Sequence, residues 1–214
     1  MKNLKLLLAG LMVVSFAACS SGGGHDGATV KEEIGTSLTI ISAKNTIKNK
    51  ATIENKNNTK KIDLSGKSQV GLKIDDNNPH TNSGVINISG EQSIGLAAVG
   101  KNSKITNTQG THINISGKDS VGMYAKDGGY AVNEGDIVIT GHNNIGMLAD
   151  GNNSVIENTK NGTIHLIGND TTIDNDGTHN AYKELGRDKH GNVGMVATHG
   201  GKIINHGKII FDKK

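Results

Sequence analysis

Ser120-Val121-Gly122-Met123-Tyr124-Ala125 is the stretch that decides the fold, because its Gly-[Leu/Met]-x-Ala core recurs along the chain. The recurring glycines are Gly71, Gly95, Gly122, Gly146 and Gly194, and the first of them opens a variant, Gly71-Leu72-Lys73-Ile74. Successive glycines lie 24, 27, 24 and 48 residues apart. A period in this range is typical of a chain that folds by stacking one small unit on the next.

Two further elements keep register with these glycines. The first is an alternating apolar run that ends in Ser/Thr-Gly, as in Ile113–Gly117 and Ile137–Gly141, and alternation of period two predicts a half-buried strand. We expect the closing glycine to supply the positive φ of a corner. The second element is an asparagine, at Asn55, Asn82, Asn107, Asn133, Asn158 and Asn205. Its register indicates either a corner residue or a ladder of stacked side-chain amides.

Three short strands per unit predict an all-β fold, a right-handed parallel β-helix with three faces and about six coils, over residues 36–214. The composition fits a narrow interior, since aromatic residues are 2% of the chain and Gly numbers 30. We expect the Leu or Met and the Ala of each repeat to point to the same side, where they would fill that interior. An antiparallel sandwich of short strands does not require the same positions to recur.

The 48-residue step predicts an insertion at residues 169–191. The strand run Ile164–Gly168 lies where the period of the earlier runs predicts it, but the next Gly-Met segment lies further along the chain than the period predicts. Insertions in solenoids emerge on one face and often carry binding. The candidate contact residues are Asp174, Asp176, His179, Tyr182, Arg187 and His190.

Metal and cofactor binding are not expected of this insertion. Asp174-x-Asp176-Gly177 resembles part of a calcium loop, but Thr172 and Lys183 occupy its first and twelfth ligand positions. The histidines lack zinc spacing, and no cysteine is near them. We therefore expect no metal and no cofactor.

Residues 1–18 are predicted to be a secretory signal peptide, since Lys2 and Lys5 precede an apolar run too short to span a membrane. Phe16-Ala17-Ala18-Cys19 resembles the bacterial lipobox, which implies that Cys19, the only cysteine, is the lipid-attachment residue. Residues 19–35 would then be a flexible tether. The resemblance implies a membrane partner through the acyl chains, and a location at the outer membrane and cell surface.

The charge balance excludes one class of partner. Without Lys2 and Lys5, 21 of the 23 basic residues remain against 20 acidic residues. Nucleic-acid-binding proteins show a concentrated basic footprint, and this chain has no basic run. We expect no nucleic-acid partner.

The units around Gly122 and Gly146, with Ala131-Val132-Asn133-Glu134-Gly135, resemble repeats in the passenger regions of Gram-negative autotransporters. The resemblance implies a surface-exposed right-handed β-helix used in adhesion or as a stalk. Autotransporters end in a membrane β-barrel, whereas this sequence stops at Lys214. The hypotheses are a free-standing lipid-anchored relative or a truncated piece of a larger autotransporter.

The favoured function is non-enzymatic, a lipid-anchored surface solenoid in adhesion or envelope structure, with no catalytic residue. Its partners would be a host or cell-surface ligand and, through the solenoid ends, other copies of the chain. The alternative is a polysaccharide-processing β-helix enzyme. Such a site needs clustered carboxylates or a basic catalytic group, and the sequence supplies few aromatic platforms for sugars.

Overall fold

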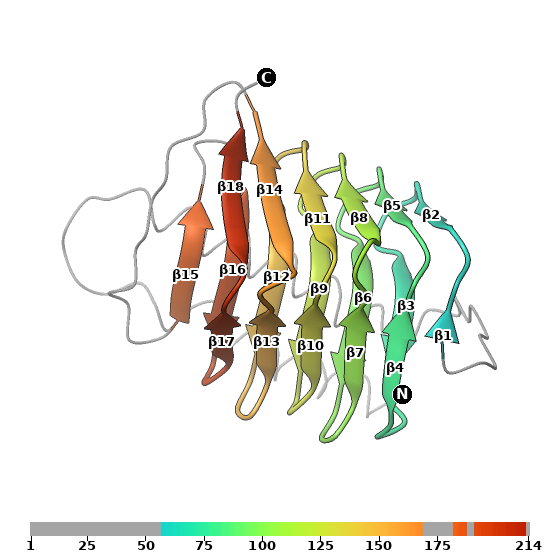
Figure 1. Cartoon of the computed structure of the whole chain (residues 1–214), viewed down its shortest axis with the longest axis vertical. Coiled ribbons are helices and arrows are strands. Elements are labelled where there is room, and N and C mark those ends of the chain that lie inside the picture. Colours follow the sequence, from blue (N-terminus) through green and yellow to red (C-terminus); the bar gives the residue numbers. More distant parts are fainter. Residues whose placement is uncertain (1–56, 169–181, 188–190, 213–214) are drawn as a thin grey trace, which may run out of the picture.

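The computed structural model describes residues 57–168, 182–187 and 191–212. The predicted signal peptide 1–18, the tether 19–35 and most of the predicted insertion lie outside these ranges. Every regular element within them is a β-strand, and the strands form three sheets of six (Figure 1). No helix in the described ranges is long and apolar enough to cross a bilayer. The predicted all-β solenoid with three faces is confirmed.

We name the sheets A, B and C. Sheet A contains β1 (Asn57–Asn58), β4 (Pro79–Asn82), β7 (Lys104–Asn107), β10 (Tyr130–Asn133), β13 (Val155–Asn158) and β17 (Lys202–Asn205). Sheet B contains β2 (Ile62–Leu64), β5 (Ile86–Ile88), β8 (His112–Ile115), β11 (Asp136–Ile139), β14 (Thr163–Ile167) and β18 (Lys208–Asp212). Sheet C contains β3 (Val70–Ile74), β6 (Ile94–Val99), β9 (Val121–Lys126), β12 (Ile145–Asp150), β16 (Val193–Thr198) and β15 (Tyr182–Arg187).

Apart from β15 and β16, which both belong to sheet C, consecutive strands fall in different sheets, so the chain winds around a common interior. β4, β5 and β6 belong to sheets A, B and C, and β7 then returns to sheet A, parallel to β4. Equivalent repeat positions pair across the coils, as Asn82 does with Asn107. Five such triads are followed by β17 and β18 of a sixth coil. The right-handed sense of winding stays a prediction.

Sheet C ends differently from sheets A and B. Its last position, beside β16, is taken by β15, which runs antiparallel and comes from the predicted insertion. A Cβ built on Gly186 of β15 would lie 2.8 Å from Cγ2 of Ile209, so this strand packs against β18. The sixth coil is therefore composite, with its third side supplied by a strand that the sequence did not predict. An unpaired strand edge attracts other chains, and β15 covers the edge of β16.

The interior is filled by inward side chains from all three sheets. Sheet B contributes pairs of isoleucines such as Ile113 and Ile115, and sheet C contributes one long and one small side chain per strand, such as Met123 and Ala125. These four side chains are at most 1% exposed. The prediction that the Leu or Met and the Ala of a repeat point to the same side is confirmed. Alternating large and small residues fill a narrow space at uniform density.

The glycines are required by the close approach of neighbouring coils. A Cβ built on Gly122 would lie 2.6 Å from the carbonyl oxygen of Gly146, its counterpart in the next coil. A Cβ on the corner residue Gly117 would collide with the carbonyl oxygen of Gly90. Neither Gly122 nor Gly117 has a positive φ, so the expectation that the closing glycine supplies one is wrong. The left-handed conformation falls two residues later, as at Asp119, whose φ is 54°.

Candidate functional site

The repeat residues identified in the sequence stack into columns. Gly71, Gly95 and Gly146 make the same close approach as Gly122, since a Cβ on each would lie 2.5–2.7 Å from the carbonyl oxygen of the next repeat glycine. The last of the series, Gly194, is that counterpart for Gly146. These residues therefore set the spacing of the coils in sheet C.

The asparagines form a buried chain of side-chain hydrogen bonds, which we call the asparagine ladder. Its members are Asn58, Asn82, Asn107, Asn133, Asn158 and Asn205. The Nδ2 of each of the first five donates to the Oδ1 of the asparagine in the next coil, over 2.7–3.0 Å. The first five are at most 2% exposed. The first member is Asn58, whereas Asn55, which the sequence analysis had placed there, lies outside the described residues.

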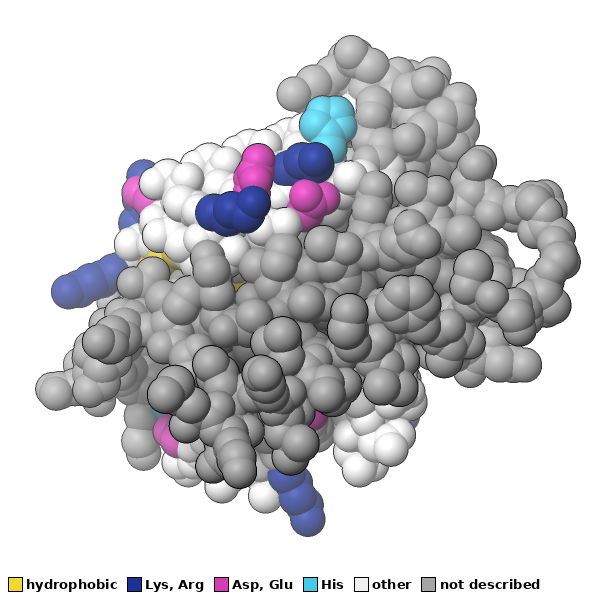
Figure 2. All heavy atoms as spheres, turned by 180° about the vertical axis from the view of Figure 1, so that it is seen from behind, with side chains coloured by type: hydrophobic (Ala, Val, Ile, Leu, Met, Phe, Trp, Pro, Cys, Tyr) yellow, Lys and Arg dark blue, Asp and Glu magenta, His cyan; other side chains and the backbone are white. Residues whose placement is uncertain are grey.

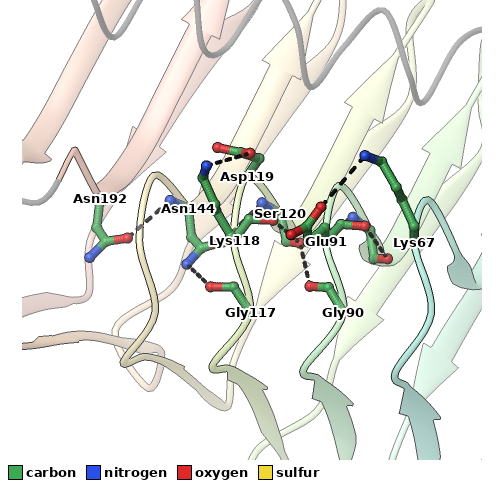
Figure 3. Close-up of polar contacts among 10 residues, drawn as sticks. Lys67, Gly90, Glu91, Gly117, Lys118, Asp119, Ser120, Asn144 and Asn192 are labelled. Carbon is green, nitrogen blue, oxygen red and sulfur yellow. Dashed lines mark hydrogen bonds and ion pairs between the residues drawn. The ribbon is translucent and has the colours of Figure 1, made fainter.

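A second buried column runs along the corner that leads into sheet C (Figure 3). We call it the corner column, and its members are Ser93, Ser120, Asn144 and Asn192, each at most 1% exposed. Each side-chain oxygen accepts a hydrogen bond from a backbone N–H of the preceding coil, as Asn144 Oδ1 does from Ser120 N at 2.9 Å. The asparagines also donate backward, Asn144 Nδ2 to the Gly117 carbonyl at 3.0 Å. This column was visible in the sequence only as the Ser or Asn that usually precedes the repeat glycine by two residues.

The predicted contact insertion is described only at its end. Asp174, Asp176, His179 and His190 lie outside the described residues. Tyr182 and Arg187 are the first and last residues of β15, and their backbones pair with Thr198 and Val193 of β16. The insertion therefore rejoins the solenoid beside Thr198, at the corner where sheet C passes into sheet A.

A cluster of polar side chains gathers at this corner. The Asp150 carboxylate accepts three hydrogen bonds: from the Tyr124 hydroxyl at 3.1 Å, from the Thr198 hydroxyl at 2.9 Å and from His199 Nδ1 at 2.7 Å. The Asp150 side chain is 15% exposed, and that of His199 is 44% exposed. These residues come from three consecutive coils, so the carboxylate ties the coils together. We call this group the Asp150 cluster.

The electrostatics of the cluster keep Tyr124 protonated. Burial raises the pKa of the Tyr124 hydroxyl well above its ordinary value, and the charges of Asp150 and Asp127 add to that rise. Tyr124 therefore remains a hydrogen-bond donor to Asp150. The bond at Nδ1 leaves Nε2 of the half-exposed His199 as the ring nitrogen available to a ligand. The cluster was missed in the sequence because Asp150 and His199 are separated by the insertion.

A second cluster lies on the outer face of sheet A. Lys104 Nζ lies 5.1 Å from the ring centroid of Tyr130, and the Tyr130 hydroxyl donates a hydrogen bond to Glu157 Oε2. Burial, the hydrogen bond to Glu157 and its charge raise the pKa of Tyr130 to about 12. The three groups belong to three neighbouring strands, so this cluster, too, connects coils at the surface.

Ion pairs between charged side chains lie along the corner between sheets B and C. Lys67 pairs with Glu91 at 3.5 Å and Lys118 with Asp119 at 3.8 Å (Figure 3). Three of these side chains are more than half exposed, and that of Asp119 is 20% exposed. Exposed pairs of this kind contribute little to stability. Within the described ranges, no group of three or more His, Cys, Asp or Glu side chains could hold a metal ion.

Comparison with known families identifies the domain type. The family model described as the BigA third pectate lyase-like domain matches residues 15–182. The chain belongs to this family. The pectate lyase-like domain thus covers the described coils as far as the first residue of β15, together with the segment that precedes β1. No curated protein and no solved structure matches the chain.

Proposed function

We propose that this pectate lyase-like domain is a lipid-anchored β-solenoid of the bacterial surface, without catalytic activity, that acts in adhesion or envelope structure. The proposal rests above all on how the insertion is mounted. Its end is a strand of sheet C, paired along β16 and packed on Ile209, beside the half-exposed His199. A segment held by a rigid sheet is the usual arrangement of a binding site on a scaffold.

The rest of the described surface supports a structural role for the coils. Carboxylates such as Asp63, Asp136 and Glu157 are engaged with neighbouring side chains on their own sheets. The repeat positions are buried and connect one coil to the next. Recognition is therefore assigned to the insertion and the Asp150 cluster.

The test is binding of fragment 25–214 to host matrix proteins and to partner cells. In the variant, residues 169–181 are replaced by a Gly/Ser stretch of equal length, so that β15 is retained. We expect binding to fall at least about tenfold, the loss typical of a removed contact segment. The control carries His112→Ala and Asn114→Ala on the outer face of sheet B and should bind normally. Equal binding by the wild type and the insertion variant would remove the insertion from the contact surface.

The lipid anchor and the assembly hypothesis have separate tests. Metabolic labelling with a fatty acid should mark the full chain and fail to mark Cys19→Ser, and membrane fractionation should show the variant released. Labelling of both would contradict attachment at Cys19.

Size measurement of fragment 25–214 tests homo-association through the ends, and a strictly monomeric species would count against it.

A second candidate is a polysaccharide-processing enzyme, favoured by the pairing of His199 with Asp150. Orientation by a carboxylate at Nδ1 is what a histidine general base requires, and Nε2 would then take the proton. Incubation with acidic polysaccharides, followed by ultraviolet detection of unsaturated products, tests this candidate. Activity that is lost in His199→Ala would replace the non-enzymatic proposal, and absence of product in the wild type would support it.

A further inference from the structure

The last strand of sheet B differs from the rest of its sheet in its outward side chains. On sheet C the outward side chains are apolar and buried, as those of Tyr124 and Leu148 are. On sheet B the outward positions in register with one another are Asp63, Asn87, Asn114, Val138, His165 and Ile210. In the view from behind, hardly any apolar side chain of the described residues is visible (Figure 2). Ile210 of β18 therefore departs from a mainly polar face, at the end of the sheet.

The end of the solenoid that contains β18 is the more exposed of the two described ends (Figure 1). β17 and β18 are the last strands of sheets A and B, and no described strand pairs with their outer edges. Their inward side chains Ile203, Ile209 and Phe211 are only partly buried, and Asn205 is exposed. In the first described coil, by contrast, the inward side chains of Asn58 and Leu64 are 2% and 5% exposed. A partner therefore finds an open strand edge at the β17–β18 end.

The backbone of β18 directs two residues to this open edge. Lys208 N donates to the Gly162 carbonyl at 3.0 Å, and the Asp212 carbonyl accepts from Gly168 N at 3.0 Å, so these groups point toward β14. Successive residues of a strand direct their backbone groups to alternate edges. Ile209 and Phe211 therefore present their N–H and C=O groups to the edge that no described strand occupies.

The sequence of β18 is complementary to itself in the antiparallel direction. The strand reads Lys208-Ile209-Ile210-Phe211-Asp212, with a base at one end and an acid at the other. When two copies run antiparallel with their Ile210 residues opposed, Lys208 of each copy lies opposite Asp212 of the other, and Ile209 lies opposite Phe211. Directly opposed unlike charges stabilise a strand pair, whereas the in-register parallel arrangement would oppose like charges. The charges therefore favour antiparallel pairing of β18 with a second copy of itself.

The pleat of the strand fits the same register. Opposed residues of an antiparallel pair alternate between pairs that exchange both backbone hydrogen bonds and pairs that exchange none. Ile209 and Phe211 have their backbone groups at the open edge, so they form the hydrogen-bonded pairs. Lys208 and Asp212 then form a non-hydrogen-bonded pair, in which the side chains lie closer. Both are exposed, and Asp212 uses Oδ2 toward His165 Nδ1 at 3.3 Å, which leaves Oδ1 for the lysine.

We propose that two copies of this chain associate end to end through β18, which pairs antiparallel with its counterpart about a two-fold axis at Ile210. Sheet B then continues from one copy into the other, and the edge of β18 is no longer open. An interface in which both copies use the same patch closes as a dimer and does not extend into a filament. The inference specifies the strand and the orientation for homo-association through the ends. It is independent of ligand binding by the insertion, which the binding assay measures separately.

Charge reversal tests the pairing in fragment 25–214, by sedimentation over a series of concentrations. Lys208→Asp and Asp212→Lys each place like charges opposite one another at both ends of the strand pair, so each should raise the dimer Kd at least about tenfold. An equal mixture of the two variants, and the double variant, should both recover the wild-type Kd, because unlike charges are opposed again. A dimer that neither substitution weakens would overturn the proposal. A wild type that stays monomeric would also overturn it and would show that the charges protect the edge.

A disulfide between the two copies tests the register. The fragment lacks Cys19, so Ile210→Cys carries its only thiol. Opposed Cα atoms of a non-hydrogen-bonded pair lie about 4.5 Å apart, within the range that a disulfide spans. Mild oxidation should therefore give a covalent dimer at least about tenfold faster than with Ile204→Cys, the matched control on the outer face of β17, which is also partly exposed. Equal rates for the two variants would overturn the pairing of β18 with itself.

Discussion

The asparagine ladder and the corner column both run the length of the solenoid, but they connect the coils differently. Within the ladder each interior amide accepts from the asparagine of one neighbouring coil and donates to that of the other, as Asn133 does between Asn107 and Asn158. In the corner column the side-chain oxygen of each member accepts from a backbone N–H of the preceding coil. An interior position of the ladder therefore needs a side chain that donates to one neighbouring coil and accepts from the other. A position of the corner column needs only a short side chain whose oxygen accepts from a backbone N–H.

This difference explains the composition of the two columns. All described members of the ladder are asparagine, because only an amide of that length reaches the next coil while its second N–H bonds to a backbone carbonyl, as in Asn133 to Gly135. The corner column contains both serine and asparagine, because either side-chain oxygen can accept from the N–H. Substitutions that break or exchange these roles can test the comparison.

The largest effect is expected from Asn133→Ala. It removes the acceptor of Asn107 Nδ2, the donor to Asn158 Oδ1 and the donor to the Gly135 carbonyl, all of them buried. The free energy of unfolding, measured by urea denaturation of fragment 25–214, should fall by about 3 kcal/mol or more. A loss below about 1 kcal/mol would show that water replaces the amide and that the ladder is not required.

A smaller loss is expected from Ser120→Ala, which breaks one link of the corner column. The backbone N–H of Ser93 loses its acceptor, Ser120 Oγ, at 3.1 Å, in a position without exposure. One unsatisfied buried donor costs about 1–2 kcal/mol. The same urea titration measures it, and a loss equal to that of Asn133→Ala would abolish the distinction between the columns.

Replacing asparagine by serine should lower the free energy of unfolding less in the corner column than in the asparagine ladder. Asn144→Ser should cost less than about 1 kcal/mol, because serine already holds the equivalent positions 93 and 120. Asn133→Ser should cost nearly as much as Asn133→Ala, since a hydroxyl has a single proton and a shorter reach. Thermal denaturation of both variants under identical conditions compares them, and equal losses would contradict the assignment.

The end of the ladder should be much less sensitive than its middle. Asn205 is exposed and has a ladder neighbour on one side only, Asn158. Asn205→Ala should change the free energy of unfolding by about 0.5 kcal/mol or less, as is usual for surface substitutions. A loss as large as that of Asn133→Ala would mean that the ladder acts as one cooperative unit.

The last prediction concerns Tyr130→Phe on the outer face of sheet A, whose effect is read from the alkaline pH dependence of stability. The pKa of Tyr130 is raised to about 12, so the folded chain keeps a proton that the unfolded chain loses near pH 10. Tyr130 therefore contributes stability that is fully present below pH 10 and is lost as the pH rises toward about 12. Tyr130→Phe should flatten this part of the pH dependence in thermal denaturation, with Asn205→Ala as a control. An unchanged slope would contradict the assignment.

Much of the architecture could be predicted from residue patterns. The alternation in Ile113–Gly117 and the period of the repeat glycines predict strands, faces and the stacking of coils, because side-chain direction in a strand follows sequence parity. The ladder position in the first coil could not be read correctly. Ile53-Glu54-Asn55 looks like Ile156-Glu157-Asn158, yet Asn58 stands four residues before the strand residue Ile62, as Asn133 stands before Ile137.

The candidate site could be predicted much less completely. The insertion was predicted from the break in the repeat, but β15 carries no repeat signal, because an antiparallel strand need not copy the pattern of its parallel neighbours. Asp150 and His199 have no motif spacing, and they meet only because their coils stack.

By itself, the sequence determined the repeating unit, the three-sided winding and the place where the repeat is interrupted, because each of these follows from local periodicity. Only the tertiary structure decided which groups meet across coils. It showed the backbone partners of the corner column, the carboxylate shared by Tyr124, Thr198 and His199, and the strand that completes sheet C. It also showed that the outer face of sheet C is buried. These contacts join residues distant in the chain, whose proximity depends on the number of residues in every intervening turn.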